Sequence, residues 1–282
     1  MNYLCIWGDG RRSSDRKHFC ILLWHKLKKI MKKYSELYSD SGNPKVRLSE
    51  EEYQIIYNYR EKTKPKEKRI LVIGDLHTPF DLEEYHQHCV DTYHKWNCNQ
   101  VIFIGDIIDN HYSSFHEVNI DADYSGKQEL DLAIDRLKRY YKSFPKADVI
   151  IGNHDRMIMR KAQTSAIPSK WIKDYKDVLE VPNWNFTERV EYDQVQYIHG
   201  EAGTARTKSK ADMQSTVQGH LHTQAYTEYT VGRNFKIFGM QIGCGIDFSS
   251  YAMAYAKAGK KPAVGCGVVI GGKTAINCMM EL

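Results

Sequence analysis

Five short segments of the chain contain residue types that bind divalent metal ions, and they follow one another in a distinctive order. The segments are Gly74–His77, Gly105–Asp109, Gly152–Asp155, His199–Gly200 and Gly219–His222. Four of the five follow or end a run of apolar residues that favour β-strands. In α/β proteins, binding groups collect just beyond the carboxyl ends of such strands. The five segments are therefore expected to meet at one metal site.

From Arg69 onward, strand and helix patterns alternate along the chain. Short apolar runs predict buried strands at residues 70–73, 101–104 and 148–151. A helix is predicted over residues 82–95, and another begins at the capping box formed by Ser125 and Gln128. Apolar strands that alternate with helices indicate a largely parallel sheet covered on both faces.

The second half of the chain has a different pattern, with shorter strands in succession. They are predicted at residues 195–198, 216–218, 225–231, 235–242 and 264–270. Few helical patterns lie between most of them, so this half is expected to form a second, more antiparallel sheet.

Residues 1–65 are expected to form an N-terminal extension, and residues 66–282 the main domain. The extension contains a capping box, Ser49–Glu52, that leads into apolar residues at helical spacing, so one amphipathic helix is predicted to reach roughly Lys62. It would dock on the main domain or form an oligomer contact, and docking is favoured. Met31 precedes the better-patterned region, so residues 1–30 are hypothesised to lie upstream of the natural start.

Composition excludes several classes of protein. The apolar stretches are far shorter than the ~20 residues that span a bilayer, and no signal peptide with a cleavage site is present, so a membrane protein is not expected. Seven cysteines without a C-x-x-C pair indicate reduced thiols and a cytoplasmic location. The net charge of +5 favours anionic substrates but is too small to specify nucleic acid.

The donor atoms of the five segments suit particular metals. Carboxylates with imidazoles and an amide oxygen fit Mn²⁺, Fe²⁺ or Zn²⁺ better than Ca²⁺. Seven ligands are too many for one tetrahedral ion, and they suit two ions about 3.5–4 Å apart with one bridging carboxylate. Each segment alone has an ordinary explanation: Gly74–His77 as a turn with a capping aspartate, His199 as a half-buried histidine. The ordered set at strand ends disfavours five such coincidences.

This arrangement resembles the calcineurin-like metallophosphoesterase superfamily, whose signature is D-x-H, G-D-x-x-D, G-N-H-[DE], a later His, and G-H-x-H. The resemblance covers residues 69–270. It implies a four-layer α/β-β/α sandwich, with two mixed sheets, flanking helices and a dinuclear metal site at the carboxyl ends of the strands. It assigns one metal to Asp75, His77, Asp106 and His222. It assigns the other to Asp106, Asn153, His199 and His220, with Asp106 bridging.

The resemblance also implies a reaction, hydrolysis of a phosphoester bond by a metal-activated hydroxide. His154 matches the catalytic histidine that stabilises or protonates the leaving oxygen. Asp109 and Asp155 would orient the ligands or His154. Thr78 after His77, Asn110 after Asp109, and Asp155 in place of Glu disfavour a protein phosphatase. The motifs look more like those of phage and bacterial phosphoesterases whose substrates are unassigned.

The substrate is expected to contact loops at the strand ends. His111 and Arg156 lie in or next to these motifs, and Arg206 belongs to a basic stretch between His199 and His220. Such cations would suit a phosphodiester or nucleotide, although solvated loop charges explain them equally well. Two other classes stay open, a non-catalytic scaffold on the same fold and a nucleic-acid-binding protein. Retention of His154 and of every expected ligand favours the enzyme.

Overall fold

The computed structural model describes residue 49 and residues 67–114, 124–200, 202–250 and 261–281. The predicted helix after Ser49, the remainder of residues 1–65 and the hypothesis about Met31 lie outside the described residues and stay predictions. The described residues from Glu67 onward belong to one compact unit.

Six strands form the first sheet, in the order β11-β10-β1-β2-β3-β4. They are β1 (Arg69–Ile73), β2 (Gln100–Phe103), β3 (Asp148–Ile150), β4 (Asn185–Thr187), β10 (Gly265–Ile270) and β11 (Thr274–Met279). The four strands β1 to β4 are parallel, and β10 and β11 add an antiparallel edge. The three strands predicted in the first half of the domain are confirmed, with ends that shift by a residue.

Five strands form the second sheet, in the order β5-β6-β7-β9-β8. They are β5 (Val190–Tyr192), β6 (Val195–Ile198), β7 (Ser215–Gln218), β8 (Tyr226–Val231) and β9 (Lys236–Gln241). The expectation of a more antiparallel sheet holds only at its edges, because β6, β7 and β9 are parallel. The predicted strand at residues 264–270 was also placed in the wrong sheet, since β10 pairs with β1.

The parallel pairing of β6 with β7 depends on a helix that the sequence reading missed. Parallel neighbours need a long crossover connection, usually a helix. Here α7 (Ala205–Asp212) supplies it and packs on β7 and β9, and the side chain of Thr204 accepts a hydrogen bond from the Thr207 backbone N–H to begin the helix.

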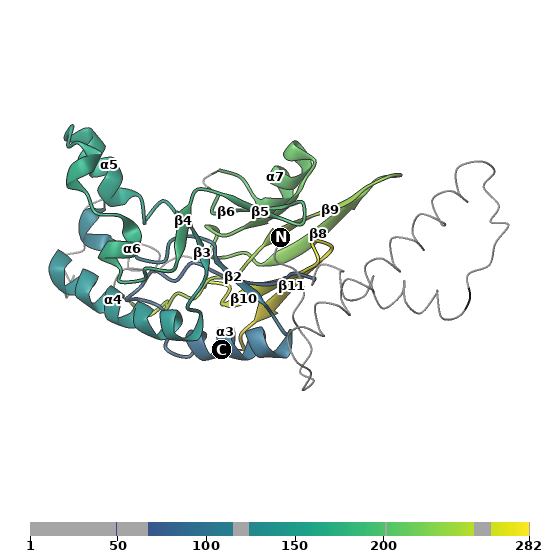
Figure 1. The fold of residues 1–282 in the computed structure, drawn as a ribbon, viewed down its shortest axis with the longest axis horizontal. Helices are drawn as coiled ribbons and strands as arrows, with labels where there is room; N and C mark the ends of the chain where they lie inside the picture. Colours follow the sequence, from purple (N-terminus) through teal and green to yellow (C-terminus); the bar gives the residue numbers. More distant parts are fainter. Residues whose placement is uncertain (1–48, 50–66, 115–123, 201, 251–260, 282) are drawn as a thin grey trace, which may run out of the picture. The chain divides into compact units, whose positions relative to one another are not determined.

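The described elements form four layers (Figure 1). The helices α3 (Tyr85–Lys95) and α4 (Gly126–Ser143) cover one face of the first sheet, and α7 lies on the outer face of the second. Successive residues of β1 face opposite sides, as in any strand. Leu71 and Ile73 pack toward the helices, whereas Ile70 and Val72 pack between the sheets. The fold is therefore the expected α/β sandwich of two mixed sheets and flanking helices.

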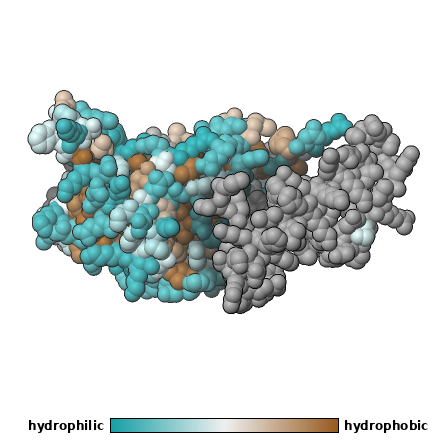
Figure 2. Space-filling model, in the orientation of Figure 1, coloured by the Kyte–Doolittle hydropathy of each residue, from teal (hydrophilic) through white to brown (hydrophobic). Residues whose placement is uncertain are grey.

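The remaining described helices are short, and in the sequence they fall between β2 and β4. They are η1 (His111–Ser113), α5 (Met157–Thr164), η2 (Ser169–Trp171) and α6 (Tyr175–Val178). The capping box at the start of α4 is confirmed, because Ser125 and Gln128 each accept the backbone N–H of the other. On the face shown in Figure 2, the described surface is mostly hydrophilic. Within the described residues, no helix has the length and hydrophobicity to cross a membrane.

Candidate metal centre

The sequence-predicted ligands lie at the carboxyl ends of strands in both sheets. Asp75, Asp106 and Asn153 follow the parallel neighbours β1, β2 and β3, so their side chains leave the same edge of the first sheet. His199 and His220 follow β6 and β7 in the second sheet. The two edges face each other, because the His220 backbone N–H donates to Asp75 Oδ2 at 2.7 Å.

The first ligand group consists of Asp75, His77, Asp106 and His222. One nitrogen or oxygen atom from each lies within 4.8 Å of the others. His222 Nε2 is 3.1 Å from Asp75 Oδ2, and His77 Nε2 is 3.6 Å from Asp106 Oδ2. His222 is partly exposed and the other three are buried. These are the four residues that the family resemblance assigns to one metal.

The second ligand group consists of Asp106, His199 and His220, whose donor atoms also lie within 4.8 Å of one another. Asn153 adjoins it, since its Oδ1 lies 2.9 Å from His199 Nε2, and the same nitrogen lies 3.1 Å from Asp106 Oδ2. Asp106 thus belongs to both groups, which is the position required of a bridging carboxylate.

Three of the predicted ligands have left-handed backbone conformations. The φ angles are 50° at His77, 47° at Asp106 and 68° at His220. Residues other than glycine rarely adopt this region, and each such residue costs about 1–3 kcal/mol unless its surroundings hold it there. Here the backbone N–H of His77 donates to the Asp106 carbonyl at 2.8 Å. Such strain is typical of functional sites, where the position of a side chain is maintained at the cost of a less favourable backbone conformation.

Glycine is required at two positions beside the ligands. A Cβ atom at Gly152 would lie 2.1 Å from Asp106 Oδ1, and one at Gly105, where φ is +108°, would lie 2.5 Å from His199 Nδ1. Both contacts are far inside van der Waals separation. The glycines in the sequence motifs therefore provide the space in which Asp106 and His199 approach the neighbouring turns.

The electrostatics of the site centre on Asp106. Burial opposes its ionisation, but His199 and His77 outweigh burial and hold the pKa of Asp106 well below its usual range. Burial likewise lowers the pKa of His199, yet the charge of Asp106 outweighs it and raises that pKa to about 10. Asp106 and His199 thus each favour the charged form of the other, and a cation bound there would compete with a proton on His199.

Two buried polar atoms of the first ligand group have no hydrogen-bond partner. They are Asp75 Oδ1 and His77 Nε2. Unpaired buried polar atoms are rare, because each forfeits the interactions it has in water. The opposite nitrogen of His77, Nδ1, lies 2.6 Å from Asp109 Oδ1 and donates to it, which leaves Nε2 with a lone pair directed at the cluster. The residues therefore fit a pair of divalent cations.

His154 lies next to the candidate ligands but is not a member of either ligand group that contains Asp106. Its Nδ1 donates to the Asp109 carbonyl oxygen at 2.7 Å, so Nε2 is the nitrogen not engaged in this bond. Its ring meets that of His77 edge to face at 4.4 Å between centroids. Burial lowers the pKa of His154, but the carboxylates of Asp106 and Asp109 outweigh burial and raise it.

Asp155 supports the turn that carries Asp106. Its carboxylate accepts the backbone N–H groups of Gly152, Asp106, Ile107 and Ile108 at 2.8–3.3 Å. Burial and the charge of Asp106 raise the pKa of Asp155 to about 7, whereas the N–H donors of Gly152 and Ile108 act in the opposite direction. Asp155 thus ties the Asp106 turn to the Asn153 turn.

The three predicted substrate contacts have different surroundings. His111 Nδ1 is 3.8 Å from Asp109 Oδ2, and Arg156 lines a cavity beside Asn153. Arg206 lies on α7, where its guanidinium pairs with Glu228 and sits over the Tyr226 ring at 4.7 Å. The partners of Arg206 thus belong to β8 and not to the ligand groups.

One residue of the cavity beside Asn153 was not predicted from the sequence. Arg160 lines the same cavity as Arg156, one helical turn further along α5. The signal was available, because residues four apart share a helix face. No helix was predicted after Asp155, so the spacing of the two arginines carried no meaning.

The chain is similar to several solved structures over most of their length. An archaeal phosphodiesterase shares 14% identity over 75% of this chain and 99% of its own, with a TM-score of 0.39. Vps29 from Entamoeba histolytica shares 14% identity over 76% of this chain and 99% of its own, with a TM-score of 0.36. The nuclease MPE from Pseudomonas putida shares 13% identity over 75% of this chain and 86% of its own, with a TM-score of 0.35. No curated protein sequence matches the chain. Residues 68–229, more than half of the chain, match the family described as calcineurin-like phosphoesterase. The chain therefore belongs to the calcineurin-like phosphoesterase family, and is a metal-dependent phosphoester hydrolase.

Proposed function

We propose that the chain hydrolyses phosphodiester or nucleotide-type substrates at a dinuclear centre formed by the two ligand groups. The observation that carries this proposal is the position of Asp106, whose carboxylate belongs to both groups while its neighbours in space include His154. Asp75, His77 and His222 would complete one side, and Asn153, His199 and His220 the other. The pair would be Mn²⁺, Fe²⁺ or Zn²⁺.

The residues around the candidate ligands would have separate roles in the reaction. Two bound cations supply Lewis-acid charge neutralisation and a water of lowered pKa. His154 would protonate or hydrogen-bond the departing oxygen through Nε2, because Nδ1 is engaged by the Asp109 carbonyl. Asp109 would also orient His77 through its carboxylate, and Asp155 would hold the Asp106 turn in place.

Two other classes of function stay as alternatives. A scaffold on the same fold needs neither His154 nor a complete ligand set, and both are present here. A nucleic-acid-binding protein would depend on the basic N-terminal extension, which lies outside the described residues. A cytoplasmic location and the likeness to phage-type phosphoesterases stay predictions from the sequence.

A substrate comparison tests the diester assignment. With Mn²⁺ present, wild-type protein is expected to hydrolyse bis(p-nitrophenyl) phosphate at least tenfold faster, in kcat/KM, than p-nitrophenyl phosphate. The reason is that a diester has a single negative charge and carries a second substituent in place of the second charge of a monoester. Release of p-nitrophenolate measures both rates, and protein treated with a chelator is the control. A higher kcat/KM for the monoester would contradict the diester preference.

A further inference from the structure

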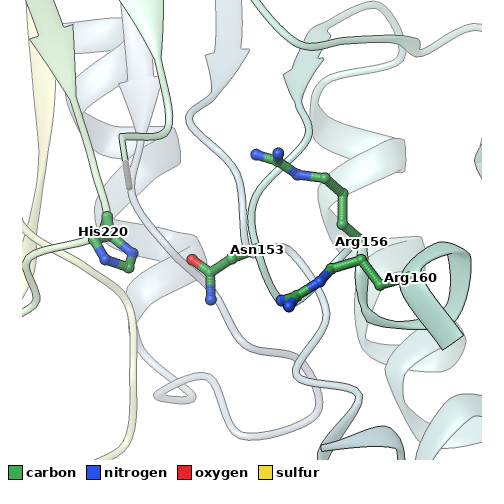
Figure 3. A pocket seen from close by; sticks show the side chains of 4 residues that line it. All are labelled: Asn153, Arg156, Arg160 and His220. Carbon is green, nitrogen blue, oxygen red and sulfur yellow. The ribbon is translucent and has the colours of Figure 1, made fainter. Parts of the chain in front are cut away.

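A cavity of about 330 Å³ opens beside the second ligand group. It is lined by Asn153, His220, Arg156 and Arg160, so two predicted metal ligands form one side and two arginines the other. Figure 3 shows the amide oxygen of Asn153 pointing toward His220, the guanidinium of Arg160 extending from α5 toward Asn153, and that of Arg156 lying above Asn153 in this view. This volume lies near the lower end of the range for small-molecule sites, roughly 300–1,000 Å³.

The start of α5 places the two arginines on one face. Arg156 is the residue before the helix and Arg160 lies four residues later, so both side chains project to the same side. Arg156 Nε donates to the Gly152 carbonyl at 3.2 Å, and Arg156 Nη2 to the Ile151 carbonyl at 3.3 Å, which fixes this guanidinium beside the Asn153 turn. Its ion pair with Glu188 is 3.7 Å long and exposed.

The lining of the cavity suits an anion. No carboxylate lines it, and guanidinium groups bind phosphate oxygens through paired N–H donors. The cavity contacts only the ligand group of Asn153 and His220, and not Asp75, His77 or His222 of the other group. A phosphate bound between the two groups would be the one that reacts, so the arginines are positioned for a different phosphate to one side of it.

The segment that runs on from the cavity-lining arginines adds positive charge to the exposed surface. Residues 156–173, from the start of α5 to the end of the loop before α6, contain five Lys or Arg and no Asp or Glu. Lys161, Lys170 and Lys173 are exposed, and the side chain of Trp171 is 82% exposed. Cations with an exposed aromatic ring are the combination that binds unpaired nucleic acid, through phosphates and stacked bases.

We propose that Arg156 and Arg160 bind the phosphate adjacent to the scissile one in a single strand of nucleic acid. The inference rests on the proposed diester hydrolysis and adds the substrate class. Arg160 is the specificity-determining residue to test, because Arg156 also supports the Asn153 turn. A small compound with two linked phosphates offers the same chemistry, and the basic surface beyond the cavity favours the strand.

The test compares Arg160→Gln with Lys161→Gln, which removes the same charge from the same helix but does not line the cavity. Arg160→Gln is expected to raise KM at least tenfold for a short single-stranded oligonucleotide and to change kcat/KM less than twofold for bis(p-nitrophenyl) phosphate. Lys161→Gln is expected to raise the oligonucleotide KM less than threefold. The slope of log affinity against log salt should fall by about 0.7 in Arg160→Gln, one phosphate contact on a single strand.

Three outcomes would overturn the proposal. An equal loss on both substrates would place Arg160 on the scissile phosphate, and an equal effect of Lys161→Gln would reduce the cavity to general surface charge. A similar Arg160→Gln penalty on ADP-ribose, with no penalty on the oligonucleotide, would assign the cavity to small diphosphates. Failure of the proposed function itself looks different, because wild-type protein would then not hydrolyse bis(p-nitrophenyl) phosphate.

Discussion

Asp106→Asn is expected to lower kcat/KM for bis(p-nitrophenyl) phosphate by about 10³-fold or more. Asp106 is the carboxylate that both ligand groups share, and it carries the negative charge that His199 balances. Asparagine keeps the shape but cannot bridge two cations. Metal-ion stabilisation of a phosphoryl transition state amounts to several kcal/mol, and a loss of ~4 kcal/mol corresponds to about 10³-fold in rate.

The matched control is Asp174→Asn, an exposed aspartate before α6 that makes no side-chain capping bond. It is expected to retain wild-type activity. Thermal unfolding of both variants without added metal separates a damaged fold from a damaged site. Asp106→Asn that remains folded and hydrolyses the diester within tenfold of wild type would show that Asp106 does not bridge the metals.

His154→Ala is expected to lower kcat by about 10²–10⁴-fold while metal binding persists, the usual contribution of a general acid. Nδ1 of His154 donates to the Asp109 carbonyl. His154 belongs to neither of the two ligand groups that contain Asp106, so its loss should leave the metal ligands in place. The loss should grow with the pKa of the leaving group, because a poor leaving group depends more on proton donation. Steady-state kinetics on a series of substituted aryl and alkyl diesters measures this dependence.

His94→Ala serves as the comparison variant, since His94 is an exposed histidine in the last turn of α3. Calorimetric titration with Mn²⁺ shows whether each variant still binds metal. A loss in His154→Ala that is the same for every leaving group would contradict proton donation and leave His154 a positioning residue. An undiminished kcat would remove it from the mechanism altogether.

The positions of the candidate metal ligands at the strand ends could be predicted from the sequence because each depends on a local rule. Apolar runs identify β1, β2 and β3, and a glycine after each run marks the turn that presents Asp75, Asp106 or Asn153. The sequence cannot say which strands pair, because pairing is decided by contacts between distant segments. Thus β10 was expected beside the later strands, whereas it pairs with β1, and its successive residues Val268 and Val269 face the two cores on either side of the first sheet.

The substrate side of the site was predicted less well for a related reason. The sequence leaves open whether Arg206 and the basic residues near it contact a substrate or are solvated loop charges. In the structure they lie on α7. There Lys208 pairs with Asp212 of the same helix, and Lys210 pairs with Glu228 of β8. Charge alone does not distinguish a cation that meets a substrate from one that pairs across a helix and a strand. Arg160 shows the converse, because only the helix places it beside Asn153.

The central claim is that the five segments form one dinuclear phosphoesterase centre, and titrating metal-free wild-type protein with Mn²⁺ tests it most directly. Calorimetry and diester hydrolysis would be followed on the same samples. The account predicts two ions per chain, negligible hydrolysis without metal, and activity that rises to its plateau as the second ion binds. A single ion at the plateau, or hydrolysis that survives complete removal of metal, would contradict it.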